Sequence, residues 1–141
     1  MHCNRIIAEA RSWLGTPYKH RAAVKGAGCD CLGLVMGVYA ALVGPVPEDP
    51  PPYSRDWAEA AGEETLLAAA RRHLVELPVA EAGPGDVLIF RILTGRICKH
   101  AGILSRPGHM IHAMEGHGVV EIALSPWWRR KVAAAFAFPG A

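Results

Sequence analysis

The sequence predicts an α+β domain in which N-terminal helices pack on a C-terminal antiparallel β-sheet meander. Apolar residues recur at helical spacing in the first half of the chain, whereas the second half consists of short β-rich segments between Gly- and Pro-containing turns. Helices that precede a run of strands are typical of α+β domains. The length of 141 residues fits a single domain over residues 1–141.

Three helices are predicted in the first half. Helical spacing of apolar residues indicates one helix over Ile6–Leu14 and a second from Cys31 to Leu42, and Gly and Pro residues follow both. The Pro-rich stretch 45–53 is predicted to be a surface loop, because proline disrupts helix interiors and central strands. A third helix is predicted for Trp57–His73. Cys31 is therefore expected at the N-terminus of the second helix.

The second half is predicted to contain five strands. Short runs rich in β-branched and aromatic residues alternate with turn signals such as Gly83-Pro84-Gly85-Asp86 and Arg106-Pro107-Gly108. The runs follow one another closely, which favours an antiparallel meander. The predicted strands are Val87–Arg91, Ile97–Leu104, His109–Ala113, Val119–Ala123 and Val132–Phe138.

Composition narrows the classes of function. A formal net charge of +2 without a long basic run argues against nucleic acid as a partner. No apolar run approaches the roughly 20 residues of a membrane-spanning helix, so membrane insertion is not expected. The N-terminus lacks the pattern of a secretory signal peptide. The four cysteines are too sparse for a disulfide scaffold and are expected to be free thiols.

Cys31 is the first candidate for a chemical role. A free thiol is mostly protonated at neutral pH, so a nucleophilic cysteine needs a positive local potential, which a helix N-terminus and an imidazole can both supply. Cys31 has the predicted helix N-terminus, and Gly28 and Gly33 permit a sharp turn there. A buried structural cysteine is the alternative, and spacing alone does not separate the two.

Two histidines in neighbouring predicted strands strengthen the catalytic interpretation. If the hairpin closes through Ser105-Arg106-Pro107, simple pairing sets Gly102 opposite Met110 and His100 opposite His112. Directly paired residues share a face of the sheet, so one imidazole can orient the other as a base. A bulge in the turn would shift this register by one residue. Each histidine taken singly is also a common half-buried strand residue.

Five short motifs resemble, in order, those of the NlpC-type cysteine peptidases. They are Gly15-Thr16-Pro17-Tyr18, Asp30-Cys31-Leu32-Gly33-Leu34-Val35, Gly85-Asp86-Val87-Leu88, His100-Ala101-Gly102-Ile103 and Ile111-His112-Ala113. The resemblance runs from the first helix to the last strand. Within this family the chain is most similar to small single-domain enzymes encoded with phage tail or tail-like particle genes, including in its Pro-rich loop and its Phe136-Ala137-Phe138-Pro139 ending.

The resemblance implies a papain-like NlpC-type fold and catalytic core. By this resemblance Cys31 is the nucleophile, His100 is the base and then the acid, and His112 orients His100. The hydroxyl of Tyr18 would lie near the thiol and the oxyanion. The resemblance implies neither a metal nor another cofactor.

The same resemblance implies a substrate subsite. Asp30 matches the acidic residue that helps to receive the polar stem peptide. Apart from the resemblance, His20 is expected to be solvent-exposed at the border of the cleft, where it could touch substrate. Leu32 stands where the family usually has Ser or Thr, and Cys29 stands where it usually has an aromatic residue. The change at Leu32 affects the expected subsite and leaves the nucleophile assignment unaltered.

The implied function is that of a peptidoglycan hydrolase. The chain would be a cysteine endopeptidase that cleaves the stem peptide at the γ-D-glutamyl-diaminopimelate bond during entry of a phage or phage-like particle. Its expected partners are the peptidoglycan stem peptide and phage or phage-like tail proteins. Without a predicted signal peptide, it would be made in the cytoplasm and act in a virion or tail-like particle at the cell wall.

Other interpretations compete with this one. Cys29 and Cys31, with His109, His112 and His117, offer zinc ligands, although Cys-x-Cys is tighter than the usual zinc spacing. A non-catalytic tail assembly protein could keep the fold without the activity. An N-acyl amidase or acyltransferase would use the same thiol on another bond.

Three further residues receive structural interpretations. Trp127 and Trp128 are predicted to pack against the end of the sheet, although such a pair could also stack on sugars. Cys98 is predicted to be a small apolar filler near His100.

Overall fold

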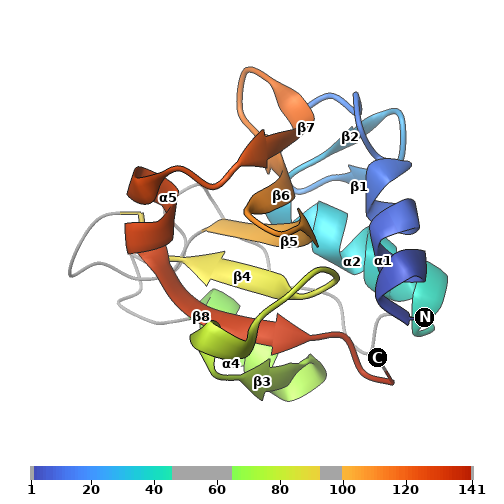
Figure 1. Ribbon diagram of the computed structural model, residues 1–141. Helices are drawn as coiled ribbons and strands as arrows, with labels where there is room; N and C mark the ends of the chain where they lie inside the picture. Colours follow the sequence, from blue (N-terminus) through green and yellow to red (C-terminus); the bar gives the residue numbers. More distant parts are fainter. Residues whose placement is uncertain (1, 46–64, 93–99, 141) are drawn as a thin grey trace.

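The computed structural model describes residues 2–45, 65–92 and 100–140 (Figure 1). Its helices are α1 (His2–Arg11), α2 (Cys31–Leu42), α4 (Thr65–His73) and α5 (Pro126–Lys131), with a short 3-10 helix, η1 (Val79–Glu81). Its strands are β1 (Ala23–Val24), β2 (Gly28–Cys29), β3 (Val75–Leu77), β4 (Val87–Phe90), β5 (His100–Arg106), β6 (His109–Met114), β7 (Gly118–Ala123) and β8 (Val132–Ala137).

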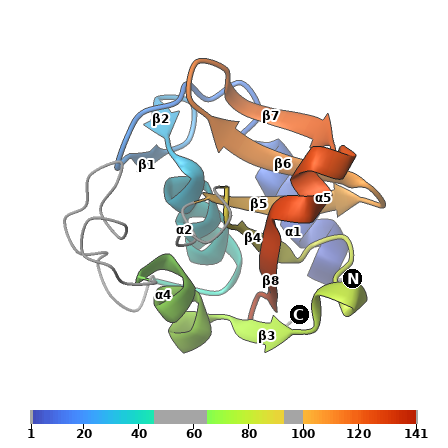
Figure 2. The ribbon, with the colours of Figure 1, turned by 90° about the vertical axis from the view of Figure 1, so that its left-hand side faces the viewer.

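The main sheet has six antiparallel strands in the order β3-β8-β4-β5-β6-β7. The predicted α+β class is confirmed, and β4 to β7 form the predicted meander. The last strand departs from a simple meander, because β8 pairs with β4 and not with β7. The short helix α5 leads from β7 to β8 over one face of the sheet (Figure 2).

Both faces of the sheet are buried. One face packs against α1, α2 and α4, and it includes Ala101 and Ile103 of β5. The other face lies under α5 and includes Leu104 of β5 and Met110 of β6. Because alternate strand residues point to opposite faces, His100 shares the second face with Leu104. Two layers of side chains, one on each face of the sheet, therefore position the candidate site.

The first helix spans His2–Arg11 and not the predicted Ile6–Leu14. Beyond it, the N–H groups of Trp13 and Leu14 bond to carbonyls three residues back, which tightens the chain into a turn. Gly15 then adopts a φ of +86°, a conformation that favours glycine. Trp13 is nevertheless buried, so the apolar spacing continues past the last helical hydrogen bond.

Some predicted segments lie outside the described residues. They are most of the Pro-rich loop, the third helix before Thr65 and strand residues 97–99, which include Cys98. Within the described residues the third helix is confirmed as α4. The strands β1, β2 and β3 and the helix α5 were not predicted, because each is short. No helix in the described part of the chain is long and apolar enough to span a membrane.

Helix α2 approaches the preceding loop closely because Gly33 has no side chain. A Cβ at Gly33 would overlap the carbonyl oxygen of Ala22. The same carbonyl accepts a hydrogen bond from the N–H of Asp30 at 3.2 Å. One turn further along α2, a Cβ at Gly37 would overlap the indole ring of Trp13, in the turn that follows α1. The position of α2 between the loop and α1 therefore depends on glycine at two points.

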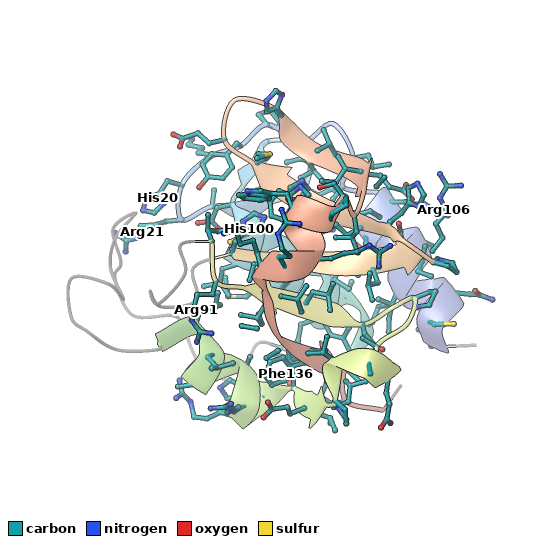
Figure 3. All side chains as sticks on the ribbon, turned by 60° about the vertical axis from the view of Figure 1, so that its left-hand side comes forward. His20, Arg21, Arg91, His100, Arg106 and Phe136 are labelled. Atoms are coloured by element: carbon teal, nitrogen blue, oxygen red, sulfur yellow. The ribbon has the colours of Figure 1, made fainter. Side chains whose placement is uncertain are left out.

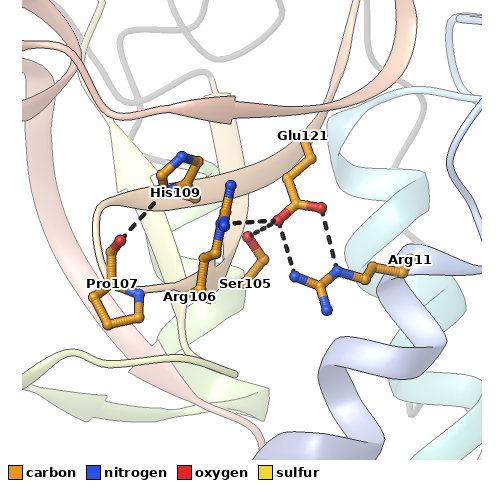
Figure 4. A network of polar contacts seen from close by, with 6 residues as sticks. All are labelled: Arg11, Ser105, Arg106, Pro107, His109 and Glu121. Carbon is orange, nitrogen blue, oxygen red and sulfur yellow. Dashed lines mark hydrogen bonds and ion pairs between the residues drawn. The ribbon is translucent and has the colours of Figure 1, made fainter.

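A polar network ties α1 to the sheet (Figure 4). Arg11 of α1 donates two hydrogen bonds, of 3.2 and 3.1 Å, to the carboxylate of Glu121 in β7. Ser105 donates a third at 2.7 Å, and Arg106 lies 4.0 Å from the same carboxylate. Hydrogen bonding by Arg11 lowers the pKa of Glu121, so the carboxylate stays ionised.

We expect Gly33→Ala to lower the free energy of unfolding by about 1–3 kcal/mol, because the added methyl group displaces α2 from Ala22. Gly83→Ala is the matched control, since its Cβ would meet nothing within 4 Å. Urea unfolding of the two variants measures the difference. Equal stability of both variants would contradict the close packing of α2 on the loop.

Candidate active site

Cys31 is the first residue of α2 and keeps partial exposure to solvent. The backbone N–H groups of Ala101, Leu32 and Cys31 itself act on its thiol and favour the ionised form. Ala101 belongs to β5 and directly follows His100 in the chain. The start of α2 therefore meets β5 at the thiol, and N–H groups from both elements surround it.

The surroundings of Cys31 favour the protonated thiol. Burial raises the pKa of Cys31 to about 12, and the carboxylate of Asp30 adds to the rise. The N–H groups around the thiol oppose this increase and only reduce it. Although Cys31 keeps partial exposure, the protein atoms around the sulfur disfavour a thiolate. A nucleophilic role therefore requires a base that removes the proton.

His100 and His112 form a hydrogen-bonded pair on β5 and β6. Nε2 of His100 lies 2.8 Å from Nδ1 of His112, and the two rings are nearly perpendicular, at 82°. The shared face was predicted and is confirmed by this contact. The direct pairing was wrong: Leu104 lies opposite Met110, and the register shifts after Leu104, toward Arg106.

The predicted pairing of β5 with β6 is wrong by two residues, and an error of this size leaves His100 and His112 on the same face of the sheet. The predicted partner of Met110 was Gly102, whereas the observed partner is Leu104. Strand side chains alternate with a period of two, so a shift of two residues moves His100 along the strand without turning it over. His100 therefore reaches His112 diagonally.

The contact between the two rings determines which nitrogen is available to the thiol. His100 Nε2 is occupied by His112, so Nδ1 of His100 remains for proton exchange. If Nδ1 accepts a proton, Nε2 must donate to His112 Nδ1, and His112 then carries its own proton on Nε2. His112 Nε2 is buried and has no hydrogen-bond partner among the described residues.

Burial favours the neutral form of both imidazoles. Burial lowers the pKa of His100 to about 3, and the charge of His112 contributes to the decrease. Burial also lowers the pKa of His112 to about 4, with a contribution from His117. His112 is completely buried, whereas His100 keeps some exposure. A neutral His100 can accept a proton from the neutral thiol.

Trp128 covers both histidines and was assigned only a packing role from the sequence. Its ring centroid lies 5.5 Å from His100 at a tilt of 32° and 5.2 Å from His112 at 89°. Phe90 completes the enclosure, at 5.8 Å from His100 and 5.2 Å from Trp128. Ser125 before Pro126 is a helix-start signal that could have predicted α5, although not its position over the histidines.

Tyr18 and His20 lie on the loop that leads from α1 to the cysteine. Backbone bonds of 3.0 Å join Pro17 and Lys19, on either side of Tyr18, to Cys29. Tyr18 is thereby held beside the residues that precede the nucleophile candidate. Figure 3 places His20 on the same side of the molecule as His100.

Asp30 is a buried helix cap. Its Oδ1 accepts a hydrogen bond from Gly33 N at 2.8 Å, and its Oδ2 accepts one from Arg21 N at 2.7 Å. Arg21 has a φ of +65°, which is unusual for a residue with a side chain. His20 Nδ1 lies 3.9 Å from Oδ2, and the Asp30 side chain is only 4% exposed. The carboxylate therefore has a structural role, which any substrate contact would share.

The remaining predicted residues separate into core and surface groups. Leu32 is half-buried against the main core, and Cys29 is completely buried within it. His109 bonds through Nδ1 to the Pro107 carbonyl at 3.2 Å, and His117 is exposed in a turn. In the part of the chain that the structure describes, no group of three or more His, Cys, Asp or Glu residues is arranged to hold a metal.

Comparison with known proteins finds one matching family. The NlpC/P60 family matches residues 15–136 of the chain. Over 128 residues the chain is 27% identical to the gamma-DL-glutamyl hydrolase of Bacillus subtilis. The aligned region covers 90% of this chain and 27% of that protein. The chain therefore spans only about a quarter of the length of this relative.

Solved structures share the fold. An NlpC/P60 family protein from Bacillus cereus superposes with a TM-score of 0.70 at 21% identity, covering 96% of this chain and 40% of that chain. The NlpC/p60 domain of the peptidoglycan hydrolase SagA gives a TM-score of 0.67 at 23% identity, covering 96% of this chain and 98% of that chain.

The buried histidines predict a pH-dependent stability. The folded chain keeps His112 neutral down to a pH of about 4, whereas the unfolded chain takes up the proton near 6.5. The free energy of unfolding should therefore be highest above pH 6.5 and fall below it, by at most about 1.4 kcal/mol per pH unit for each histidine.

Urea unfolding between pH 7.5 and 5 measures this slope. His112→Asn cannot titrate, and its amide can occupy the position of Nδ1, so the slope should decrease. His109→Asn is the control outside the pair and should keep the slope of the unaltered protein. A slope unchanged by His112→Asn would exclude this ring as its source.

Proposed function

Because the chain belongs to the NlpC/P60 family, we propose that it is a cysteine peptidase that hydrolyses the stem peptides of bacterial peptidoglycan. The observation that carries this proposal is the juxtaposition of two groups. The partly exposed thiol of Cys31 starts α2 beside β5, and the neutral His100 on β5 is hydrogen-bonded to His112. The name of SagA as a peptidoglycan hydrolase supports the substrate class.

The neutral pair favours a general-base mechanism. Nδ1 of His100 takes the thiol proton while the sulfur of Cys31 attacks the carbonyl carbon of the scissile amide. The N–H groups of Leu32 and Cys31 are available to stabilise the negative oxygen, and Tyr18 is proposed to assist through its hydroxyl.

Collapse of this intermediate breaks the C–N bond, and His100 transfers its proton to the leaving amine. The acyl group is left on Cys31 as a thioester. Water then attacks the thioester while His100 again accepts a proton. The C–S bond breaks, His100 returns the proton to the sulfur of Cys31, and the product leaves with a free carboxylate. His112 holds the His100 ring through both steps by accepting from Nε2.

We propose the γ-D-glutamyl-diaminopimelate bond as the point of cleavage. The Bacillus subtilis relative is named a gamma-DL-glutamyl hydrolase, which supports a γ-glutamyl amide as the scissile bond. Asp30 and His20 are proposed to receive the free α-amino group of the preceding L-Ala. The half-buried Leu32 offers no hydroxyl at this subsite, so the Asp30 carboxylate would be the main polar contact there.

The proposed setting is entry of a phage or a phage-like particle. The similarity of the Pro-rich loop and of the C-terminal segment to tail-associated enzymes supports a virion or tail-like particle as the site of action, with tail proteins as partners. The protein would be made in the cytoplasm and reach the wall with the particle. Detection of the chain in purified particles by mass spectrometry tests this setting.

The nucleophile assignment is tested by product analysis. We expect the unaltered protein to release L-Ala-γ-D-Glu from muropeptides. Cys31→Ser should lower the rate at least about 10³-fold, because the nucleophilic sulfur is removed. Cys29→Ala removes the neighbouring core thiol without burying a hydroxyl, and it should keep most of the activity.

Each other interpretation has its own outcome in that experiment. Cleavage between the sugar lactate and L-Ala would identify an amidase. Loss of activity with a chelator, restored by zinc, would favour metal ligation. Full activity of Cys31→Ser would overturn the cysteine mechanism.

The amine subsite predicts a change in substrate preference for Asp30→Asn. Because the carboxylate also caps α2, this variant loses stability as well as a charge. The informative quantity is therefore the ratio of kcat/KM for a free-amine L-Ala-γ-D-Glu-diaminopimelate peptide to that for its N-acetylated form. We expect this ratio to fall about tenfold.

Asp86→Asn is the matched control for the Asp30 experiment. Asp86 also accepts a backbone hydrogen bond, from Gly83 N at 2.9 Å, in a turn between η1 and β4. Its substitution should lower stability without altering the substrate ratio. A ratio that stays the same in Asp30→Asn would remove Asp30 from the subsite and leave it a structural role.

A further inference from the structure

Trp128 occupies an unusual position for a residue that merely packs the end of a sheet. It contacts both rings of the His100–His112 pair and also Phe90, so three aromatic or imidazole rings surround it on the sheet side. The neighbouring Trp127 is 43% exposed; its ring contacts Trp128, and the ammonium of Lys131 lies 5.3 Å from its centroid. The two adjacent tryptophans therefore have different surroundings.

The helix that carries Trp128 is held at both ends. At its start Ser125 accepts from Trp128 N at 3.4 Å, and Leu124 N donates to the Gly108 carbonyl at 2.7 Å. At its end the N–H of Arg91, which follows β4, donates to the Lys131 carbonyl at 2.8 Å. The indole is thus fixed relative to β4 and to the hairpin that carries the histidines.

The tilted contact with His100, at 5.5 Å and 32°, has two chemical consequences. An indole face excludes water from one side of the imidazole, which disfavours protonation of the resting ring. The same face attracts a cation, so it can stabilise the imidazolium that forms when His100 takes the thiol proton. It also leaves the His100 ring little freedom to rotate away from its hydrogen bond with His112.

The perpendicular contact with His112 concerns the unsatisfied nitrogen. His112 Nε2 is buried and has no conventional partner in the described chain. The Trp128 ring lies 5.2 Å from the ring that carries this nitrogen, at an angle of 89°. Trp128 thereby packs against a buried ring whose Nε2 hydrogen bonding does not satisfy.

We propose that Trp128 is a positioning residue that holds His100 and His112 in register for proton transfer and shields them from water. This inference rests on the proposed function of the pair. It adds a residue of α5 to a site that the sequence motifs place on α2, β5 and β6. Trp127 has no such role.

Several titratable groups surround the pair, and the test must separate them from Trp128. His112 acts on His100, His117 acts on His112, and Asp30 acts on Cys31. Arg91 follows β4 next to Phe90. The basic residues of α5 itself are Arg129, Arg130 and Lys131. Substituting Trp128 leaves all of these groups in place.

The test compares Trp128→Ala, Trp128→Phe and Trp127→Ala on the L-Ala-γ-D-Glu-diaminopimelate peptide. We expect Trp128→Ala to lower kcat about 10- to 100-fold with little change in KM, because the base is mispositioned. The acidic limb of kcat/KM should move to higher pH, since water admitted to His100 raises its pKa toward 6.5. Trp128→Phe should keep most of kcat and most of the original position of the acidic limb. Trp127→Ala should match the unaltered protein in both quantities.

A purely structural role would give a different result. It would lower activity in proportion to the folded fraction, measured by thermal unfolding, and would leave the acidic limb of kcat/KM unchanged. That outcome overturns the proposal. Equal effects of Trp127→Ala and Trp128→Ala also overturn it. If Trp128→Ala does not fold, Trp128→Leu keeps the bulk without an aromatic face, and a kcat and acidic limb like those of Trp128→Phe would overturn the proposal.

A second measurement keeps the inference separate from the peptidase activity. Alkylation of Cys31 by iodoacetamide, read by peptide mass spectrometry, reports the exchange of a proton between the thiol and His100 whether or not any stem peptide is cut. Its pH dependence should shift in Trp128→Ala and not in Trp127→Ala. If no peptide is hydrolysed by the unaltered protein, this shift still supports the positioning role, and its absence rejects it.

Discussion

The carboxylate of Asp30 is the point on which the arrangement of the site depends. It bonds to Gly33 N within the first turn of α2 and to Arg21 N in the preceding loop, so a single side chain joins the helix start to the loop. The absence of a side chain at Gly33 allows the same loop, at Ala22, to lie directly on the helix. Together these contacts fix the position of the first turn of α2, from which the Cys31 side chain projects. The thiol lies close to β5.

The chemistry of the site follows from the apolar surroundings of its few polar groups, the Cys31 thiol and the two imidazoles. Phe90 and Trp128 lie against the His100 ring, and burial lowers the pKa of both imidazoles and raises the pKa of the thiol, which favours the uncharged forms. In the proposed mechanism, an uncharged thiol and an uncharged base would make the proton transfer part of the attack on the substrate. Backbone N–H groups, which cannot be lost by side-chain substitution, are the donors that face the sulfur.

Much of the candidate site could be predicted because its signals are local. The helix start at Cys31 follows from apolar spacing, and the shared face of His100 and His112 follows from strand alternation, which a register error of two residues does not disturb. Trp128 could not be placed in this way. Its contacts with the histidines depend on where α5 lies over the sheet. The spacing of apolar residues in the sequence does not predict this position.

The sequence by itself determined the α+β class, the helix that begins at Cys31, the meander of β4 to β7 and the faces on which the histidines lie. Only the tertiary structure decided that β8 returns to pair with β4, that the hairpin bulges beyond Leu104, and that Trp128 covers the two rings. The physical reason is the range of the interactions. Side-chain periodicity records which face of an element is buried, whereas strand order and register depend on contacts between residues distant in the chain.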